Sequence, residues 1–196
     1  MIPNSAVPVF RERMKFAFRA APSVRMNALV RIIAIDPSLR SSGYAVLEKI
    51  GTKVRTLDYG VVKNPVSLLA SGCLVAIRER IAEVIAKHGP ECAVFEGVIF
   101  VQSHRTAITL GAARGAALVA AAERGLPIFE YAPKRVKQSV VGRGGAQKQQ
   151  VAFMVRVLLG LSETPPADAA DALAIGLTHF QHAAGARQGL MPLVRI

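Results

Sequence analysis

The sequence predicts a single α/β domain, and three features of the chain support that prediction. Five short apolar segments are typical of strands, and only turns separate the first three. Longer segments with helical periodicity separate the later strands. With 196 residues, 52% of them hydrophobic, the chain is also long enough to bury one sizeable core.

The N-terminal part of this domain predicts three strands joined by turns. Residues 31–36 form a β-branched run that ends in Asp36, and residues 36–43 form a turn-rich loop. Residues 44–48 and 54–62 supply two more strands, which indicates an antiparallel meander. Asp36 could be an ordinary turn residue, but functional sites of α/β sheets gather at the C-terminal ends of strands.

Helices and strands alternate along the rest of the domain. A helix over 67–88 ends at Gly89-Pro90, and a strand over 92–95 leads into a second acid, Glu96. A helix over 103–124 carries a face of small residues, which indicates either close packing on the sheet or a helix-to-helix dimer face. The remaining expected elements are a strand over 127–131, a short helix from Pro133, and helices over 147–159 and 167–182.

Asp168 and Asp171 lie three residues apart in the last predicted helix, so they share one helical face. The prolines directly upstream are typical of a helix start, where the helix dipole favours acidic side chains. From this segment alone, the two acids could equally stabilise a helix start or bind a metal ion. Asp36 and Glu96 extend the set to four acids in apolar surroundings. Carboxylates suit Mg²⁺ or Mn²⁺, and two such ions can activate water and stabilise the leaving oxygen in phosphodiester hydrolysis.

The net charge is the most informative bulk property. It is +12, and such an excess attracts polyanions, with nucleic acid the favoured partner, although a membrane surface or ribosomal RNA fits the number equally.

A glycine-rich loop over 142–148 carries Arg143 and Lys148, which suit a phosphodiester backbone or are simply solvated. We find no run long enough to span a bilayer, and two cysteines without metal-type spacing favour a reducing compartment.

Residues 1–29 form a basic extension, with six bases against one acid between positions 1 and 31. They hold no long apolar segment of the kind that a secretory signal requires. The extension could be a transit peptide, a basic arm for nucleic acid, or an over-extended start with the true start at Met26. We favour the last, because the ordered pattern begins directly after it. Residues 184–196 form a tail without clear periodicity.

Several motifs resemble, in order and spacing, the RuvC family of Holliday-junction resolvases, and the similarity covers about residues 32–182. The motifs are Asp-Pro-(x)₂-Arg-(x)₂-Gly-Tyr at 36–44, Glu96 with a nearby phenylalanine, Leu-Gly-Ala-Ala-Arg-Gly at 110–115, Phe-Glu-Tyr-Ala at 129–132, Val-Lys-Gln-(x)-Val-Val-Gly at 136–142, and Ala-Asp-Ala-Ala-Asp-Ala-Leu-Ala-Ile at 167–175 before Thr178-His179.

This resemblance implies an RNase H-like nuclease domain at residues 30–183. Its five-stranded mixed sheet would have three antiparallel strands first and helices on its flanks. The resemblance further implies a homodimer that makes paired, symmetric nicks in four-way DNA junctions during recombination and DNA repair. Such an enzyme would work in the cytoplasm beside a branch-migration motor complex, without a membrane.

The resemblance also implies roles for individual residues. Four acids would bind two Mg²⁺ ions per subunit, with Mn²⁺ as an alternative, and these acids are Asp36, Glu96, Asp168 and Asp171. Lys148 would match the family's catalytic lysine and add charge stabilisation at the transition state. The family's DNA-contacting lysines would match Lys137 and Lys148. Beyond this match, we also expect Arg143 of the glycine-rich loop and Arg40 to contact DNA.

The chain departs from the family pattern at two places near these acids. Ser38 stands where the family usually has glycine after Asp-Pro, and serine disfavours the positive φ that such a position can need. The family aromatic that probes the junction centre falls three residues after the glutamate. That position is Ile99 here, with Phe100 next, so either residue could contact the junction.

Two other functions fit the same residues. A junction-binding protein without catalysis would use the four acids only structurally, although the presence of all four argues against it. A related RNase H-like nuclease could instead act on RNA, but the stretches 129–132 and 136–138 favour the junction resolvase.

Overall fold

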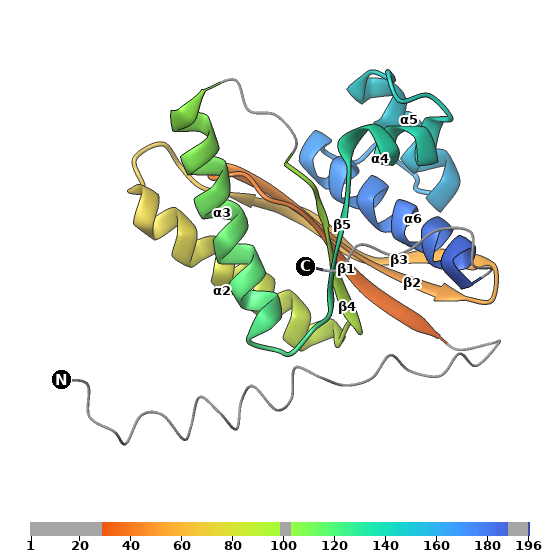
Figure 1. Cartoon of the computed structure of the whole chain (residues 1–196), viewed down its shortest axis with the longest axis horizontal. Helices are drawn as coiled ribbons and strands as arrows, with labels where there is room; N and C mark the ends of the chain where they lie inside the picture. The colour runs from red at the N-terminus through yellow and green to blue at the C-terminus, as the bar shows by residue number, and fades with distance from the viewer. Residues whose placement is uncertain (1–28, 99–102, 188–195) are drawn as a thin grey trace.

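The computed structural model describes residues 29–98, 103–187 and 196, which form a five-stranded sheet between two layers of helices (Figure 1). The strands are β1 (Val30–Asp36), β2 (Ser41–Ile50), β3 (Lys53–Lys63), β4 (Cys92–Glu96) and β5 (Ile128–Tyr131). The helices are α2 (Ala70–His88), α3 (His104–Ala122), α4 (Pro133–Val141), α5 (Lys148–Leu159) and α6 (Ala167–Arg187). The proposed basic extension up to residue 28 and most of the tail lie outside the described residues.

The sheet is mixed, as predicted, with the strand order β3-β2-β1-β4-β5. β1 pairs with β2 and β2 with β3 in antiparallel orientation, which confirms the predicted meander. β4 and β5 then add to the other side of β1 in parallel orientation. β1 and β4 therefore end at the same edge of the sheet, and each ends in an acid.

The second strand begins earlier than predicted. Residues 41–43, expected in a loop, pair with both neighbouring strands, because Gly43 faces Asp36 on β1 and Ser41 faces Lys63 on β3. The turn signals after Asp36 therefore define only a short connection over 37–40, while pairing with two neighbours extends the strand. α6 also runs further than expected, to Arg187.

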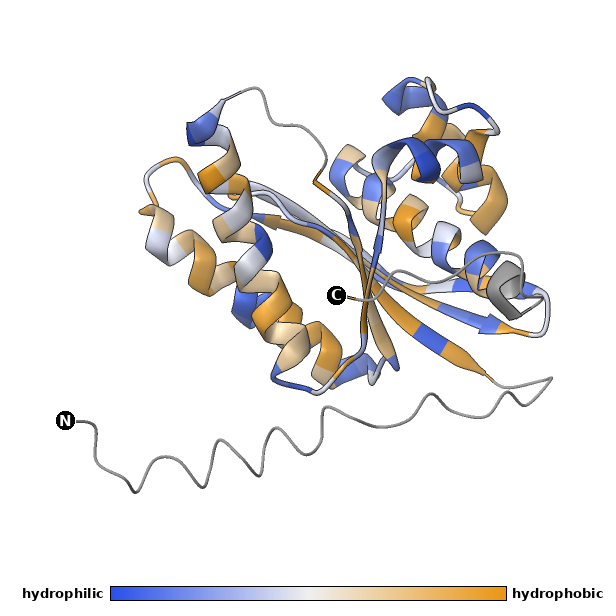
Figure 2. Ribbon diagram, in the orientation of Figure 1, coloured by the Kyte–Doolittle hydropathy of each residue, from blue (hydrophilic) through white to orange (hydrophobic). Residues whose placement is uncertain are grey.

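The two faces of the sheet carry separate cores. α2 and α3 cover one face, and α4, α5 and α6 cover the other (Figure 1). Successive strand residues point to opposite faces, so Ile33 and Ile35 pack toward α2 and α3, while Ala34 packs under α6. By the same alternation Asp36 projects on the α6 side. Figure 2 shows that the central strands are mostly hydrophobic, as burial on both faces requires.

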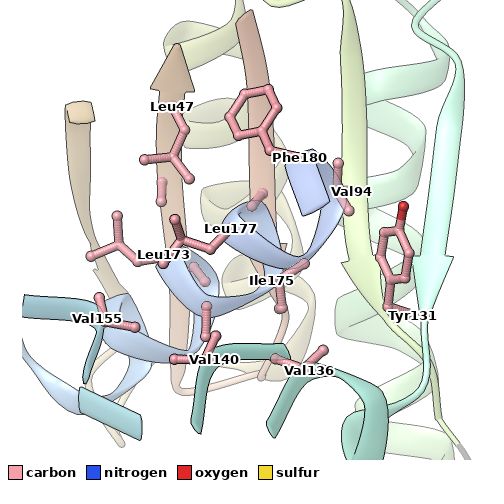
Figure 3. Close-up of a cluster of buried hydrophobic side chains, with 14 of the residues drawn as sticks. Leu47, Val94, Tyr131, Val136, Val140, Val155, Leu173, Ile175, Leu177 and Phe180 are labelled. Atoms are coloured by element: carbon pink, nitrogen blue, oxygen red, sulfur yellow. The ribbon is translucent and has the colours of Figure 1, made fainter. Parts of the chain in front are cut away.

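α6 is buried along most of its length between the sheet and helices α4 and α5. Figure 3 shows its apolar side chains meeting Leu47 and Val94 of the sheet on one side and Val136 and Val140 of α4 on the other. Gly176 permits this approach, because a Cβ there would lie 2.3 Å from the Cδ1 atom of Leu47. Among the described residues, no helix is long and apolar enough to cross a membrane.

Candidate active site

Two of the four predicted acids stand side by side at one edge of the sheet. Asp36 ends β1 and Glu96 ends β4, and these neighbouring parallel strands pair in register up to Ile35 and Phe95. Val94, two residues before Glu96 on the same strand, packs on the α6 side of the sheet. Because strand side chains alternate, Glu96 projects on that side as well, as Asp36 does. Strand alternation and parallel pairing thus bring both carboxylates to the same place.

The other two acids reach this edge from the start of α6. Asp168 lies in the first turn of the helix, so the expected favourable position in the helix dipole holds for this residue. A Cβ at Gly43 would lie 1.9 Å from the backbone oxygen of Asp168, which means that a glycine on β2 lets the helix approach. The hydroxyl of Ser41, at the start of β2, donates a hydrogen bond to Oδ2 of Asp168.

Negative charge accumulates where these elements meet. Burial, together with the charges of Asp171, Glu96 and Asp168, raises the pKa of Asp36 from 3.8 to about 7. Burial and the charge of Asp171 also raise the pKa of Glu96. Like charges this close favour protonation of one another, so the cluster has more negative charge than the surrounding protein compensates.

Glu48 shows what a compensated buried acid looks like in the same chain. Its side chain is fully enclosed, but Arg31 and Arg55 contact its carboxylate at 2.6 and 2.5 Å. The hydrogen bond from Arg31, followed by that from Arg55, lowers the pKa of Glu48. The pKa of Asp36 shifts in the opposite direction, because burial and the neighbouring carboxylates outweigh the charge of Lys148.

Lys148 provides part of the compensation within the chain. Its Nζ atom lies 3.1 Å from Oδ2 of Asp171, and this hydrogen bond raises the pKa of Lys148. Lys148 is the first residue of α5, where the helix dipole disfavours a cation, so the contact with Asp171 offsets an unfavourable position. The side chain is 73% exposed and can also reach a ligand.

A cleft of about 430 Å³ opens beside the acids. Its walls come from the ends of β1 and β4, from α3, from α4 and from the loop after α4. The lining residues are Asp36, Pro37, Glu96, Gly97, Val98, Leu110, Pro133, Lys134, Lys137 and Gly144. Lys137 lines this cleft, and its charge opposes the rise in the pKa of Glu96. Its contact with DNA stays a prediction. A cleft lined by two acids and two lysines suits a phosphodiester and its metal ions.

Two other predicted DNA contacts, Arg143 and Arg40, do not line this cleft. Arg143 is exposed in the loop after α4, and its contact with DNA stays a prediction. Arg40 uses Nη1 to donate to the carbonyl oxygens of Pro65 and Leu68, at 2.7 and 2.9 Å, which favours a structural role in holding the connection after β3. Ile99 and Phe100 lie outside the described residues.

Ser38 does not distort the loop that follows Asp36. Every positive φ in the described part of the chain belongs to a glycine, so Ser38 has an ordinary backbone conformation. Its N–H donates to Oγ of Ser42 at 3.0 Å, and that hydroxyl donates to the carbonyl of Ser38 at 2.6 Å. The loop therefore does not need glycine at this position.

The four acids fit a hard divalent cation by charge and by donor type, although the carboxylates of Asp168 and Asp171 bind protein partners. Within the described ranges, no three His, Cys, Asp or Glu side chains surround a common point as a closed ligand set. Ser41 binds Asp168 and Lys148 binds Asp171, so both aspartates would turn to bind an ion. An all-oxygen donor set with excess negative charge is the kind that Mg²⁺ and Mn²⁺ prefer.

Sequence reasoning missed two contributors to this site. Ser41 lay in a predicted loop, and its hydrogen bond to Asp168 was not predicted. Arg114 lay within a recognised motif but had no assigned role; in the structure it reaches from α3 to the backbone of Glu96. Neither contact has a local sequence signal, because each joins segments that are far apart along the chain.

Comparison with known proteins gives consistent results. Residues 32–179 match the family model described as crossover junction endodeoxyribonuclease RuvC. A protein of that name from Akkermansia muciniphila is 59% identical over 151 residues, which cover 77% of this chain and 90% of that protein. Another from Edwardsiella ictaluri is 44% identical over 148 residues, covering 76% of this chain and 85% of that protein.

Solved structures agree with these sequence matches. Thermus thermophilus RuvC, solved in complex with a Holliday junction substrate, superposes with a TM-score of 0.75 at 40% identity, covering 84% of this chain and 99% of that one. The yeast mitochondrial Holliday junction resolvase Ydc2 superposes with a TM-score of 0.59 at 13% identity, covering 94% and 90%, a likeness of fold alone. The predicted RNase H-like fold is therefore confirmed.

Proposed function

The chain belongs to the RuvC family of crossover junction endodeoxyribonucleases, and we propose that its four clustered acids carry out the cleavage with two bound Mg²⁺ ions. As a member of this family it is an enzyme that resolves Holliday junctions in recombination and DNA repair. The observation that supports the metal proposal is the meeting of four partly buried carboxylates where β1 and β4 end and α6 begins. Burial and the neighbouring carboxylates raise the pKa of Asp36 there to about 7.

Asp36, Glu96, Asp168 and Asp171 would hold the two ions, and Mn²⁺ could replace Mg²⁺. When bound, such ions supply activation of the attacking water and stabilisation of the departing 3′ oxygen. The chain's own part is to keep four carboxylates close together before the substrate arrives. Lys148 would leave Asp171 and place its ammonium near the developing negative charge.

The DNA would approach along the cleft beside the acids. Lys134 and Lys137 lie three residues apart on α4 and both line the cleft with Glu96, so they can bind phosphates on either side of the scissile one. Arg143 would add a contact from the exposed loop after α4. The net charge of +12 would supply the longer-range attraction.

A homodimer is supported by the outer face of α3. Among the described residues, no heavy atom beyond the helix's own backbone lies within 4 Å of the position a Cβ would take at Gly111 or Gly115, so packing on the sheet does not explain these glycines. With Ile108 and Val119, these glycines form a stripe at helical spacing along the outer face of α3. Ile108 and Val119 are 73% and 47% exposed. Figure 2 shows hydrophobic residues along much of α3. We infer that a second copy of the chain packs on this stripe.

The cell compartment and the motor partner belong to the same proposal. A resolvase of this family would act on chromosomal junctions in the cytoplasm, and the described residues include no helix that could span a membrane. A branch-migration motor complex would move the junction to sites that the enzyme prefers. Neither expectation depends on the geometry of the four acids.

The central test is cleavage of a labelled four-way DNA junction with and without Mg²⁺. Wild-type protein should make symmetric nicks only with the metal, and Asp36→Asn should lose cleavage by at least about 10³-fold while junction binding is retained. Glu79→Gln, on the exposed side of α2, is the control and should cleave normally. Near wild-type cleavage by Asp36→Asn would disprove the assignment, and preference for an RNA–DNA hybrid would favour the alternative nuclease.

A further inference from the structure

The end of β4 is held from the face of the sheet opposite the acids. Nη1 of Arg114, on α3, donates to the backbone oxygen of Glu96 at 2.7 Å. Nη2 of the same guanidinium forms an ion pair with the carboxylate of Glu130 on β5. The guanidinium carbon also lies 5.3 Å from the ring centre of Phe95. One side chain, only 12% exposed, thus joins α3, β4 and β5.

Glu130 completes this arrangement by packing against the residue that follows Glu96. A Cβ at Gly97 would lie 2.6 Å from Oε1 of Glu130, so that carboxylate contacts the backbone directly. The N–H of Gly97 donates to the carbonyl of Tyr131 at 2.8 Å. The backbone on both sides of the Glu96 carboxylate is therefore fixed at the point where the strand ends.

Neither Arg114 nor Glu130 touches the reacting side of the sheet. Glu130 alternates with Tyr131, which packs under α6, so Glu130 points toward α3. Arg114 reaches the carbonyl of Glu96 rather than its carboxylate, and it leaves the negative charge of that carboxylate unpaired. Such a pair can orient a metal ligand without competing with the metal.

We propose that Arg114 and Glu130 form a positioning pair that fixes the backbone of Glu96 and so holds its carboxylate ready for a divalent cation. This inference rests on the proposed function, because it assumes that Glu96 binds metal. The planar guanidinium makes two charge-assisted contacts at once, which a lysine ammonium cannot reproduce with the same geometry. Partners outside the ligand shell typically change metal affinity by 10–100-fold.

The test measures binding of Mn²⁺ alone to full-length protein by electron paramagnetic resonance. Arg114→Gln should weaken Mn²⁺ binding by about tenfold, and Glu130→Gln, which retains the side-chain shape, should weaken it less. Arg114→Lys should recover only part of the affinity. The matched control is Arg78→Gln, since Arg78 pairs with Glu123 at 2.8 Å, away from the acids, and should leave affinity unchanged.

Activity and folding provide the second readout. Thermal unfolding of each variant identifies loss of structure, which a merely structural role would produce without a change in metal affinity. Cleavage by Arg114→Gln should recover when Mn²⁺ is raised about tenfold, because the fault lies in metal binding. If Arg114→Gln does not fold, Glu130→Gln decides the question by the same measurements.

Three outcomes separate this inference from the function on which it rests. Wild-type protein that binds no Mn²⁺, or Glu96→Gln that binds like wild type, would overturn the metal proposal itself. If wild type binds Mn²⁺ and Glu96→Gln loses it, the metal proposal stands. The positioning pair is then overturned if folded Arg114→Gln and Glu130→Gln both bind within twofold of wild type.

Discussion

The ionisation of Asp36 links the site to the stability of the metal-free protein. Burial and three neighbouring carboxylates raise the pKa of Asp36 from 3.8 to about 7, so the folded state binds a proton that the unfolded state has already released in that pH range. Each pKa unit corresponds to about 1.4 kcal/mol between the protonation states. The same charges that oppose folding would favour binding of a divalent cation.

We therefore expect the metal-free protein to lose stability as pH rises from about 4 to about 7, by on the order of a few kcal/mol through this group. Asp36→Asn removes the ionisable group and should flatten that part of the profile, making the variant more stable than wild type at pH 8. Urea unfolding in a metal chelator at pH 5 and pH 8 measures the effect. Equal losses in both proteins would contradict it, and saturating Mg²⁺ should recover wild-type stability.

The residue scale also shows where sequence reasoning succeeds and where it stops. Asp36 and Glu96 could be identified because each ends an apolar strand, and Asp168 with Asp171 because three-residue spacing gives a common helical face. The partners of these acids could not be identified. Lys148 meets Asp171 across 23 positions, and such a contact has no local pattern.

At the scale of elements, the packing of α6 against the start of β2 determines the positions of Asp168 and Asp171. A Cβ at Gly43 would lie 1.9 Å from the oxygen and 2.5 Å from the carbon of the Asp168 carbonyl, and backbone cannot move aside as the end of a side chain can. The sequence predicted both elements but not their contact. Residues 41–43 were predicted in a loop because they end the turn-rich run 36–43, whereas pairing with β1 and β3 extends the strand.

Gly43→Ala should therefore displace the first turn of α6. We expect a loss of unfolding free energy at the upper end of the 1–3 kcal/mol typical of overpacking, and a larger proportional loss of cleavage, because Asp168 moves with the helix. Gly145→Ala is the control, since no described residue beyond its chain neighbours lies within 4 Å of a Cβ there. Chemical denaturation and junction cleavage measure the two effects. Wild-type cleavage by Gly43→Ala would show that α6 does not depend on this close approach.

At the scale of the whole molecule, one face of the sheet carries the chemistry and the other carries the surface proposed for assembly. The four acids, the cleft lysines and α6 lie on one side, while α2 and α3 cover the other (Figure 1). α3 belongs to both, because Arg114 reaches the backbone of Glu96 while the glycine stripe faces outward. From sequence alone, the small residues of α3 fitted packing on the sheet as well as they fitted a dimer face. The structure favours the dimer face, because no described residue packs on the two glycines.

The dimer proposal predicts that Gly111→Leu/Gly115→Leu yields a folded monomer. In the described part of the chain, no other residue lies within 4 Å of the position a Cβ would take at either glycine. Larger side chains should therefore leave the fold intact and improve helix propensity, but they would prevent close helix approach. Sedimentation should give a dimer for wild type and a monomer for the variant at equal concentration. Because symmetric resolution needs two sites on one junction, the variant should nick single strands without paired products. A dimeric variant would show that another surface joins the subunits.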